Sequence, residues 1–159
     1  MIYDSKLILE ASNKNISIAL EAISNGDVII YPTDTLYSFG VDASDTNAIL
    51  SLNRIKKRAV PLSIILPSID DISTYAIIDK QIKDKLKILL PGPFTVLLPS
   101  KNNPKIAPEV QANSALIGIR VIDNSFCNEL LFKLKKPIIT TSVNTHGNKS
   151  LMNMDDIIN

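Results

Sequence analysis

Short apolar runs alternate with amphipathic helical patterns along this chain, and this alternation limits the folds that the chain can adopt. The apolar runs have strand length and cover residues 27–31, 62–66, 94–98, 116–121 and 137–141. Patterns with apolar residues at helical spacing cover residues 13–25, 45–58, 79–90 and 124–134. We therefore expect a single α/β domain over residues 1–159, with a twisted, mixed central sheet flanked by helices.

Local residues refine this expectation. Asp45 and Asp79 precede two of the helical patterns, as N-cap residues do. In the helix that follows Asp45, the spacing predicts that Ala48, Leu52 and Ile55 face the core. The segment between the first strand and Asp45 is expected to be a polar loop.

The composition fits a globular protein and gives the chain no strong overall charge. The sequence has 159 residues, 45% of them apolar and 21% charged, with 17 basic against 16 acidic side chains. The net charge of +1 produces no global field that would attract nucleic acid, so a polyanion would need a local patch. No apolar run is long enough to span a bilayer. The N-terminus lacks the layout of a signal peptide, and the one cysteine, Cys127, fits a reducing compartment, so we expect a cytoplasmic protein without a membrane contact.

Four polar clusters stand at strand or helix ends or inside a strand, and α/β proteins usually place binding sites at such ends. They are residues 32–37, Lys56-Lys57-Arg58, Arg120, and residues 140–144. Each also has a plain structural explanation. Hydroxyl side chains are common in turns, and cations in the last turn of a helix interact favourably with its dipole. Arg120 needs a carboxylate or a bound anion as its partner, unless strand alternation places it in water.

Several other kinds of site are excluded. The sequence has no glycine-rich phosphate loop of the Walker type and no Rossmann glycine fingerprint. One His and one Cys cannot build a zinc site, and we expect no metal-binding site in the chain itself. His146 lies among small polar residues and is expected to be a surface residue rather than a general base. Cys127 lies in an apolar helical stretch and is expected in or near the core.

Five motifs, in this order, resemble those of the YrdC-like threonylcarbamoyl-AMP synthases. The motifs are Pro32-Thr33-Asp34-Thr35-Leu36-Tyr37, Lys56-Lys57-Arg58, Pro91-Gly92-Pro93-Phe94-Thr95, Ile117-Gly118-Ile119-Arg120 and Ser142-Val143-Asn144. The resemblance runs from about residue 13 to residue 150, and five matches in register are far more specific than any one. The chain departs from the family at Ser38, where Gly is usual. Because the family commonly continues past this point, we expect a domain that is short at its C-terminus.

The resemblance implies an enzyme that forms threonylcarbamoyl-AMP and pyrophosphate from L-threonine, bicarbonate or CO2, and ATP, for threonylcarbamoyl-adenosine modification of tRNA. Mg2+ would be carried with ATP, and the tRNA threonylcarbamoyltransferase machinery would accept the product. The residues implied for threonine are Thr35, Arg120 and Thr140. Those implied for ATP are Lys56, Arg58, Ser142, Asn144 and Ser150, with Lys56 and Arg58 as the catalytic cations.

Two other functions remain open on the sequence alone. A non-catalytic protein on the same fold would bind tRNA or double-stranded RNA through local cations, although the near-zero net charge weakens this interpretation. The cations concerned are Arg54, Lys56, Lys57 and Arg58. A carbamoyl-transfer domain like that of hydrogenase-maturation proteins normally belongs to a much longer chain with zinc-binding cysteines, which this sequence lacks.

Overall fold

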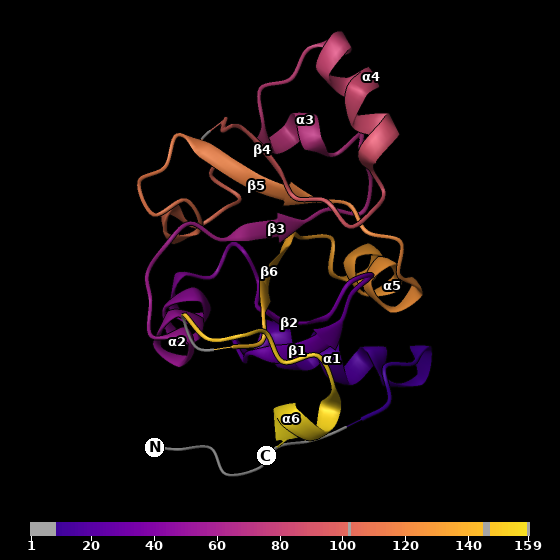
Figure 1. Ribbon diagram of the computed structural model, residues 1–159, viewed down its shortest axis with the longest axis vertical. Helices are drawn as coiled ribbons and strands as arrows, with labels where there is room; N and C mark the ends of the chain where they lie inside the picture. The colour runs from indigo at the N-terminus through magenta and orange to yellow at the C-terminus, as the bar shows by residue number, and fades with distance from the viewer. Residues whose placement is uncertain (1–8, 102, 145–146, 159) are drawn as a thin grey trace.

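The computed structural model describes residues 9–101, 103–144 and 147–158, and a twisted six-stranded sheet lies at its centre (Figure 1). The strands are β1 (Ile29–Pro32), β2 (Tyr37–Gly40), β3 (Ser63–Ile65), β4 (Val96–Pro99), β5 (Leu116–Arg120) and β6 (Ile138–Ser142). Their order across the sheet is β1-β2-β6-β3-β5-β4. β3 and β5 pair in parallel, whereas the other described pairings are antiparallel. The predicted α/β fold with a mixed sheet is therefore confirmed.

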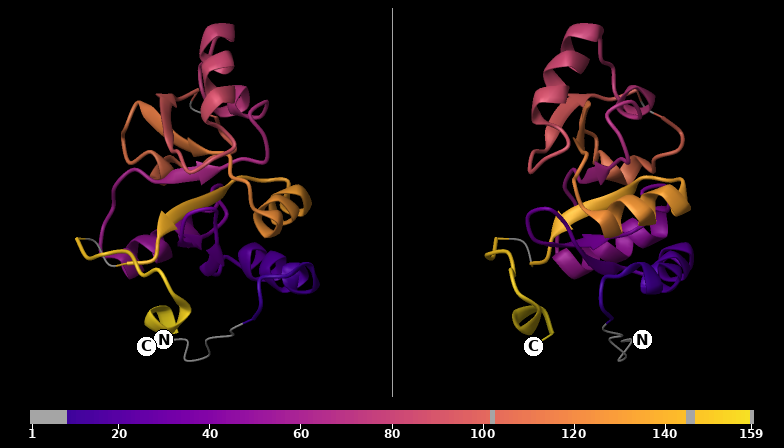
Figure 2. Two further views of the ribbon diagram at one scale, coloured as in Figure 1. Left: turned by 45° about the vertical axis from the view of Figure 1, so that its right-hand side comes forward. Right: turned by 90° about the vertical axis from the view of Figure 1, so that its right-hand side faces the viewer.

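The last strand along the chain lies in the middle of the sheet. On one side β6 pairs with β2, where Ser142 lies opposite Ser38. On the other side it pairs with β3, where Thr140 lies opposite Ser63. β6 thereby joins the β1–β2 hairpin to the half of the sheet that is built from β3, β5 and β4 (Figure 2).

Helices cover both faces of the sheet. They are α1 (Ile16–Ser24), α2 (Thr46–Lys56), α3 (Ile72–Tyr75), α4 (Lys80–Leu89), α5 (Ser125–Leu134) and α6 (Met154–Ile158), with 3-10 turns at Asn13–Asn15 and Pro108–Val110. Because strand side chains alternate between two faces, Ile64 and Ile139 pack in one core with Leu52 of α2. Ile65 and Ile138 pack in a second core with α1 and α5. In the described ranges, no helix is long and apolar enough to cross a membrane.

The predicted helix starts at Asp45 and Asp79 are confirmed. The carboxylate of Asp45 accepts hydrogen bonds from the backbone N–H groups of Asn47 and Ala48 at 2.8 and 3.1 Å. The carboxylate of Asp79 accepts one from the N–H of Ile82 at 2.7 Å. These bonds satisfy donors of the first turn, which have no partner inside a helix.

The strand β2 lies where the sequence predicted a polar loop, and that prediction was wrong. Ser38 is buried, and a Cβ atom at Gly40 would lie only 2.5 Å from the ring of Tyr31. Small residues are therefore required where β2 packs against the Tyr31 ring. A four-residue strand that carries Ser and Gly lacks the apolar run by which a buried strand is recognised in a sequence.

The inward face of α2 also differs from the prediction. Ala48 and Leu52 are buried as expected, but Ile55 is 45% exposed and the next residue, Lys56, is 1% exposed. The buried stripe continues from Leu52 by four residues rather than three, which places a lysine on the core side of the helix.

Candidate active site

One face of the sheet carries small and hydroxyl side chains across four strands. Ser142 lies opposite Ser38, and Thr140 lies level with Ser63, which in turn lies opposite Gly118. Paired residues on neighbouring strands point to the same face, as do residues two apart on one strand. A Cβ at Gly118 would lie 2.5 Å from Ser63 Oγ, so this part of the face admits no larger residue without a shift.

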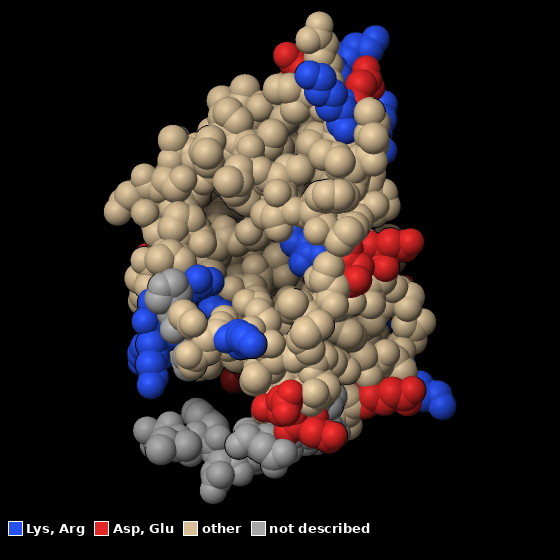
Figure 3. Space-filling view, viewed as in Figure 1, with Lys and Arg blue, Asp and Glu red and all other residues tan. Residues whose placement is uncertain are grey.

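The surface is hollowed over β3 and β6 on the side shown in Figure 3, and Lys and Arg side chains lie at the rim of this hollow over α2. Two cavities flank α2. The larger, about 530 Å³, lies at the N-terminal end of the helix beside Asp42 and Lys136, and none of the predicted site residues lines it. The other, about 420 Å³, lies at the C-terminal end of the helix and is lined in part by Arg58.

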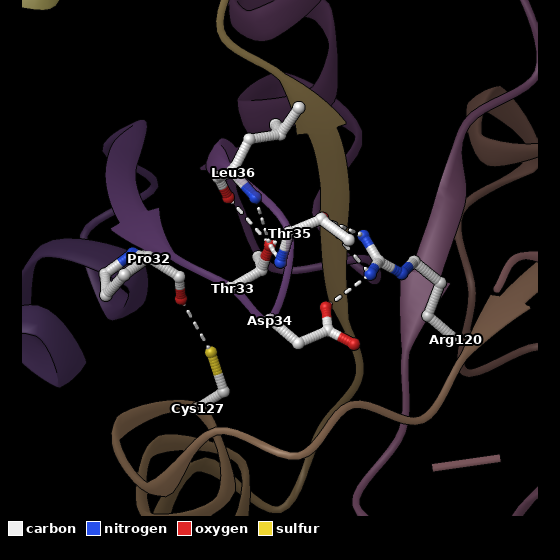
Figure 4. Close-up of polar contacts among 7 residues, drawn as sticks. All are labelled: Pro32, Thr33, Asp34, Thr35, Leu36, Arg120 and Cys127. Atoms are coloured by element: carbon white, nitrogen blue, oxygen red, sulfur yellow. Dashed lines mark hydrogen bonds and ion pairs between the residues drawn. The ribbon is translucent and has the colours of Figure 1, made fainter. Parts of the chain in front are cut away.

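Arg120 ends β5 and reaches the loop between β1 and β2 (Figure 4). Its Nη2 donates to Asp34 Oδ1 at 2.5 Å, and its Nη1 and Nη2 lie 3.5 and 3.4 Å from Thr35 Oγ1. The side chains of Arg120 and Asp34 are 10% and 11% exposed. Of the partners that the sequence allowed for Arg120, a carboxylate is the one present. Thr35 and Arg120, both predicted for threonine, lie together.

The loop that carries Asp34 and Thr35 is held by Thr33. The Thr33 hydroxyl accepts hydrogen bonds from the backbone N–H groups of Thr35 and Leu36 and donates to the Leu36 carbonyl at 2.7 Å. A threonine that bonds to the backbone two and three residues ahead is typical of tight turns. Local hydrogen bonds that do not involve Arg120 therefore hold the conformation of this loop.

The Asp34–Arg120 pair has two buried polar atoms, Asp34 Oδ2 and Arg120 Nε, with no hydrogen-bond partner in the part of the chain that the structure describes. Unpaired polar atoms are costly inside a protein, and each one in a native structure needs an explanation, such as a catalytic role or a bound water or ion. The pair is therefore not a saturated structural ion pair.

Cys127 packs beneath the same loop. It is 1% exposed, as expected for a core residue, and its thiol donates to the Pro32 carbonyl at 3.1 Å. Burial, with a smaller contribution from the negative charge of Asp34, raises the pKa of the Cys127 thiol to about 12. The thiol is thus protonated at neutral pH and is not a nucleophile.

The second group of predicted residues gathers at the end of β6. Lys56 Nζ donates to the Ser142 carbonyl at 2.5 Å and to Asn144 Oδ1 at 2.7 Å. Ser142 Oγ donates to the same Asn144 oxygen at 2.9 Å. Nζ also lies 5.6 Å from the centroid of the Phe39 ring. Burial, then the nearby positive charge of Arg58, lowers the pKa of Lys56 to about 8.

Arg58 approaches the same strand from the other side of a sharp turn. Lys57 has a left-handed backbone (φ 53°) that ends α2, so the side chains before and after it leave in different directions. Arg58 Nη2 donates to Thr141 Oγ1 at 3.1 Å, and Arg58 is only partly buried. Lys56, Arg58, Ser142 and Asn144 are therefore brought together at the end of β6, and their role in binding ATP stays a prediction.

Thr140 and Ser150 complete the predicted set. Thr140 is buried on β6, two residues before Ser142, and the carbonyl of the residue before it, Ile139, accepts a hydrogen bond from the Tyr31 hydroxyl at 3.3 Å. Burial raises the pKa of Tyr31 well above its ordinary value, so that this hydroxyl stays protonated. Ser150 precedes Leu151, whose backbone N–H donates to the Val143 carbonyl at 2.9 Å. This bond returns the chain to the end of β6, beside Asn144.

Two residues of the site had no role in the sequence interpretation. Asp34 stood inside a recognised motif, but nothing in the sequence showed that it pairs with a residue 86 positions away. Phe39 lay in a segment predicted to be a loop, so its place beneath Lys56 could not be foreseen. The one available indication was that a charge in an apolar strand, Arg120, needs an opposite charge.

No group of three or more His, Cys, Asp or Glu residues that could hold a metal ion occurs among the described side chains. His146, predicted to be a surface residue, lies outside the described residues.

Comparisons with known proteins find relatives that match most of this chain, including both clusters of predicted site residues. The family model Sua5/YciO/YrdC, described as telomere recombination, matches residues 21–159. A putative threonylcarbamoyl-AMP synthase of Methanocaldococcus jannaschii is 34% identical over 150 residues, which cover 93% of this chain and 69% of that protein. The threonylcarbamoyl-AMP synthase of Homo sapiens is 30% identical over 140 residues, or 87% of this chain and 49% of the human protein.

The fold agrees with these sequence matches. The crystal structure of P. abyssi Sua5 complexed with L-threonine superposes with a TM-score of 0.79 at 26% identity, over 91% of this chain and 42% of that one. The chain thus spans about half the length of the human relative and less than half of the P. abyssi protein. All eight predicted site residues fall inside the matched region 21–159. The chain belongs to the Sua5/YciO/YrdC family.

Proposed function

We propose that this chain is an L-threonylcarbamoyladenylate synthase, a nucleotidyltransferase that forms threonylcarbamoyl-AMP and pyrophosphate from L-threonine, bicarbonate or CO2, and ATP. The observation that carries the proposal is the pairing of two polar clusters across one sheet. One centres on Arg120 and Thr35, and the other on Arg58, Ser142 and Asn144. The names of the relatives and the threonine bound to P. abyssi Sua5 support the same assignment.

The cluster at Arg120 is the proposed threonine site. A guanidinium binds a carboxylate through parallel N–H bonds, and the hydroxyls of Thr35 and Thr140 suit the polar groups of an amino acid. Asp34 brings a negative charge beside Arg120, so the pair is close to neutral. A nearly neutral buried pair suits a zwitterionic amino acid better than a bare anion.

The cluster at the end of β6 is the proposed ATP site. Lys56 and Arg58 are the cations predicted for it, of which Arg58 is the more exposed, and Ser142, Asn144 and Ser150 supply hydroxyl and amide groups for the nucleotide. In the proposed reaction the threonine amine takes up CO2 to give a carbamate, whose oxygen attacks the α-phosphate of ATP and expels pyrophosphate. Such a transfer depends on positioning and on cations opposite the developing negative charge. Mg2+ enters as part of the ATP substrate.

The product carries an activated carbamoyl group, which we assign to threonylcarbamoyl-adenosine formation in tRNA by a separate threonylcarbamoyltransferase machinery. A cytoplasmic location belongs to the same proposal, because tRNA modification and a single cysteine both fit a reducing compartment.

The alternative, a non-catalytic RNA-binding protein, is not favoured. That interpretation used Arg54, Lys56, Lys57 and Arg58 as one basic patch. Lys56 is 1% exposed and its ammonium is bonded to Ser142 and Asn144, so it cannot contact an RNA phosphate as part of an open surface. Arg58 is partly buried and bonded to Thr141.

The test is pyrophosphate release from ATP by the purified chain with Mg2+, with and without L-threonine and bicarbonate. We expect release that requires both. Arg58→Ala should reduce the rate about 100-fold or more, as loss of a charge at a phosphate does. Lys133→Ala, which removes an exposed charge from α5, is the control and should leave the rate unchanged. Release that ignores threonine, or a folded protein without any release, would reject the proposal.

A further inference from the structure

The two cations of the ATP cluster differ in what they can reach. Lys56 is 1% exposed, and its ammonium is enclosed by the Ser142 carbonyl, Asn144 Oδ1 and the ring of Phe39. A ligand atom can approach a donor only through surface that is open to solvent, and Lys56 has almost none. Arg58 is partly exposed and borders the cavity of about 420 Å³ at the end of α2. The geometry therefore separates the roles of two residues that are only two positions apart.

The contacts of Lys56 determine how Asn144 is oriented. An ammonium group donates hydrogen bonds and accepts none, so the end of the amide that faces Lys56 must be the oxygen. The Asn144 Nδ2 group is then directed away and donates to the Asn148 carbonyl at 2.7 Å. Ser142 Oγ donates to the same amide oxygen at 2.9 Å, which also fixes the direction of the serine hydroxyl.

This arrangement accounts for a lysine on the buried face of α2. A buried ammonium is unfavourable unless oxygens and an aromatic face replace the water that it loses. Here the aromatic face is the Phe39 ring on β2. The two oxygens, at the end of β6, belong to Ser142 and Asn144, which lie 86 and 88 residues from Lys56 in the sequence. Lys56 thus ties the C-terminal end of α2 to the segment 142–144.

We propose that Lys56 is a positioning residue for nucleotide binding, which holds Ser142 and Asn144 in their binding orientation, and that of the two cations Arg58 alone contacts the phosphates. The inference rests on the proposed function, since it takes the segment 142–144 as part of the nucleotide site. It assigns to Lys56 an effect on the whole nucleotide rather than on its phosphate chain.

The first test needs no ligand and measures hydrogen exchange in the free protein. In Lys56→Met, which keeps side-chain length without the charge, backbone amides of residues 140–144 should exchange about tenfold faster, as expected when a charge-assisted bond of this strength is lost. Arg54→Met removes an exposed charge from the same helix and should leave this exchange unchanged. Equal exchange in wild type and Lys56→Met would overturn the proposal.

The second test compares AMP with ATP by calorimetry. Lys56→Met should weaken both ligands by the same factor, about tenfold, whereas Arg58→Met should weaken ATP much more than AMP. Lys56→Gln, which keeps a donor but no charge, should recover part of the loss. A variant Lys56→Met that loses ATP but keeps AMP, or equal losses in Gln and Met variants, would show a direct phosphate contact and overturn the positioning role.

A double-mutant cycle distinguishes an effect of Lys56 that acts through Asn144 from a direct contact of Lys56 with the nucleotide. If Lys56 acts through Asn144, Lys56→Met should cause little further loss of AMP affinity in an Asn144→Ala background, whereas independent contacts give additive losses. Additive losses would overturn the proposal. A wild-type protein that binds neither nucleotide would reject the proposed function and with it the nucleotide role of Lys56, while the exchange result would still decide whether Lys56 holds the segment 142–144.

Discussion

At the scale of single residues, the centre of the proposed threonine site is an ion pair that is nearly buried and not fully bonded. Asp34 and Arg120 satisfy one another through one strong contact, while one polar atom of each is buried without a partner in the described chain. That Arg120 needs a counter-charge unless it faces water follows from the sequence, since it lies in an apolar strand. The identity of that counter-charge does not, because it depends on the loop that precedes β2.

Removal of one partner should be more harmful than removal of both. Asp34→Ala leaves a buried guanidinium without its counter-charge, and we expect a loss of about 3 kcal/mol or more in the free energy of unfolding. The double variant Asp34→Ala/Arg120→Met should be less destabilised than Asp34→Ala alone. Urea unfolding of the three proteins measures this, and a double variant less stable than the single one would contradict it.

Substrate selectivity gives a second prediction at this scale. Arg120→Ala should raise the concentration of L-threonine needed for half-maximal pyrophosphate release at least tenfold, because a charge-assisted bond is lost. The ATP requirement should change little. Steady-state kinetics with each substrate varied in turn would measure both, and equal changes would point to a structural role for Arg120 instead.

At the scale of single elements, α2 shows what can and cannot be predicted from sequence. Its start was predicted correctly because Asp45 bonds to residues directly after it, so the cap is a local property. Its buried face was predicted wrongly at Ile55, because Lys56 is drawn inward by oxygens at the end of β6 and by Phe39 on β2. The two oxygens belong to residues 86 and 88 positions from Lys56, and contacts at such separations leave no mark in a local pattern.

Burial of Lys56 should make stability depend on pH. Its pKa is about 8 in the folded protein and 10.5 ordinarily, so between these values the unfolded chain holds more protons and stability rises with pH. Between pH 7 and pH 10 the free energy of unfolding of wild type should gain roughly 2–3 kcal/mol relative to Lys56→Met. The comparison removes the contribution of titrating groups common to both proteins, such as Tyr75. If the free energies of unfolding of the two proteins ran parallel as a function of pH, the prediction would be wrong.

The strand β2 was predicted to be a loop for a different reason, because packing against Tyr31 requires small residues in this strand rather than an apolar run. Gly40 leaves room for the Tyr31 ring, and a methyl group there should cost about 1–3 kcal/mol by overpacking. Gly40→Ala should therefore lower the free energy of unfolding by this amount in wild type. In a Tyr31→Leu background the same substitution should cost much less, and an equal cost in both backgrounds would show that the ring is not the obstacle.

At the scale of the whole molecule, the proposed threonine site joins both halves of the sheet, with Thr35 from the loop before β2 and Arg120 from β5, and the proposed ATP site lies at the end of β6. Ligands that bind only the folded protein stabilise it by about 2.7 kcal/mol at a hundred times their Kd, which should raise the melting temperature by roughly 5–10 °C for a chain of this size. L-Threonine and ATP should each do so in thermal unfolding. Arg120→Ala should lose the shift with threonine and keep that with ATP, and loss of both would contradict two separate sites.

The position of β6 also has a consequence for biosynthesis. A ribosome releases β6 after the other five described strands, yet this strand fills the gap between β2 and β3. Until residue 142 has left the exit tunnel, the nascent polypeptide presents two unfinished sheet edges, which are prone to pair with other chains. The edges of β2 and β3 therefore stay unpaired for longer than in a sheet whose strands pair in the order of their synthesis.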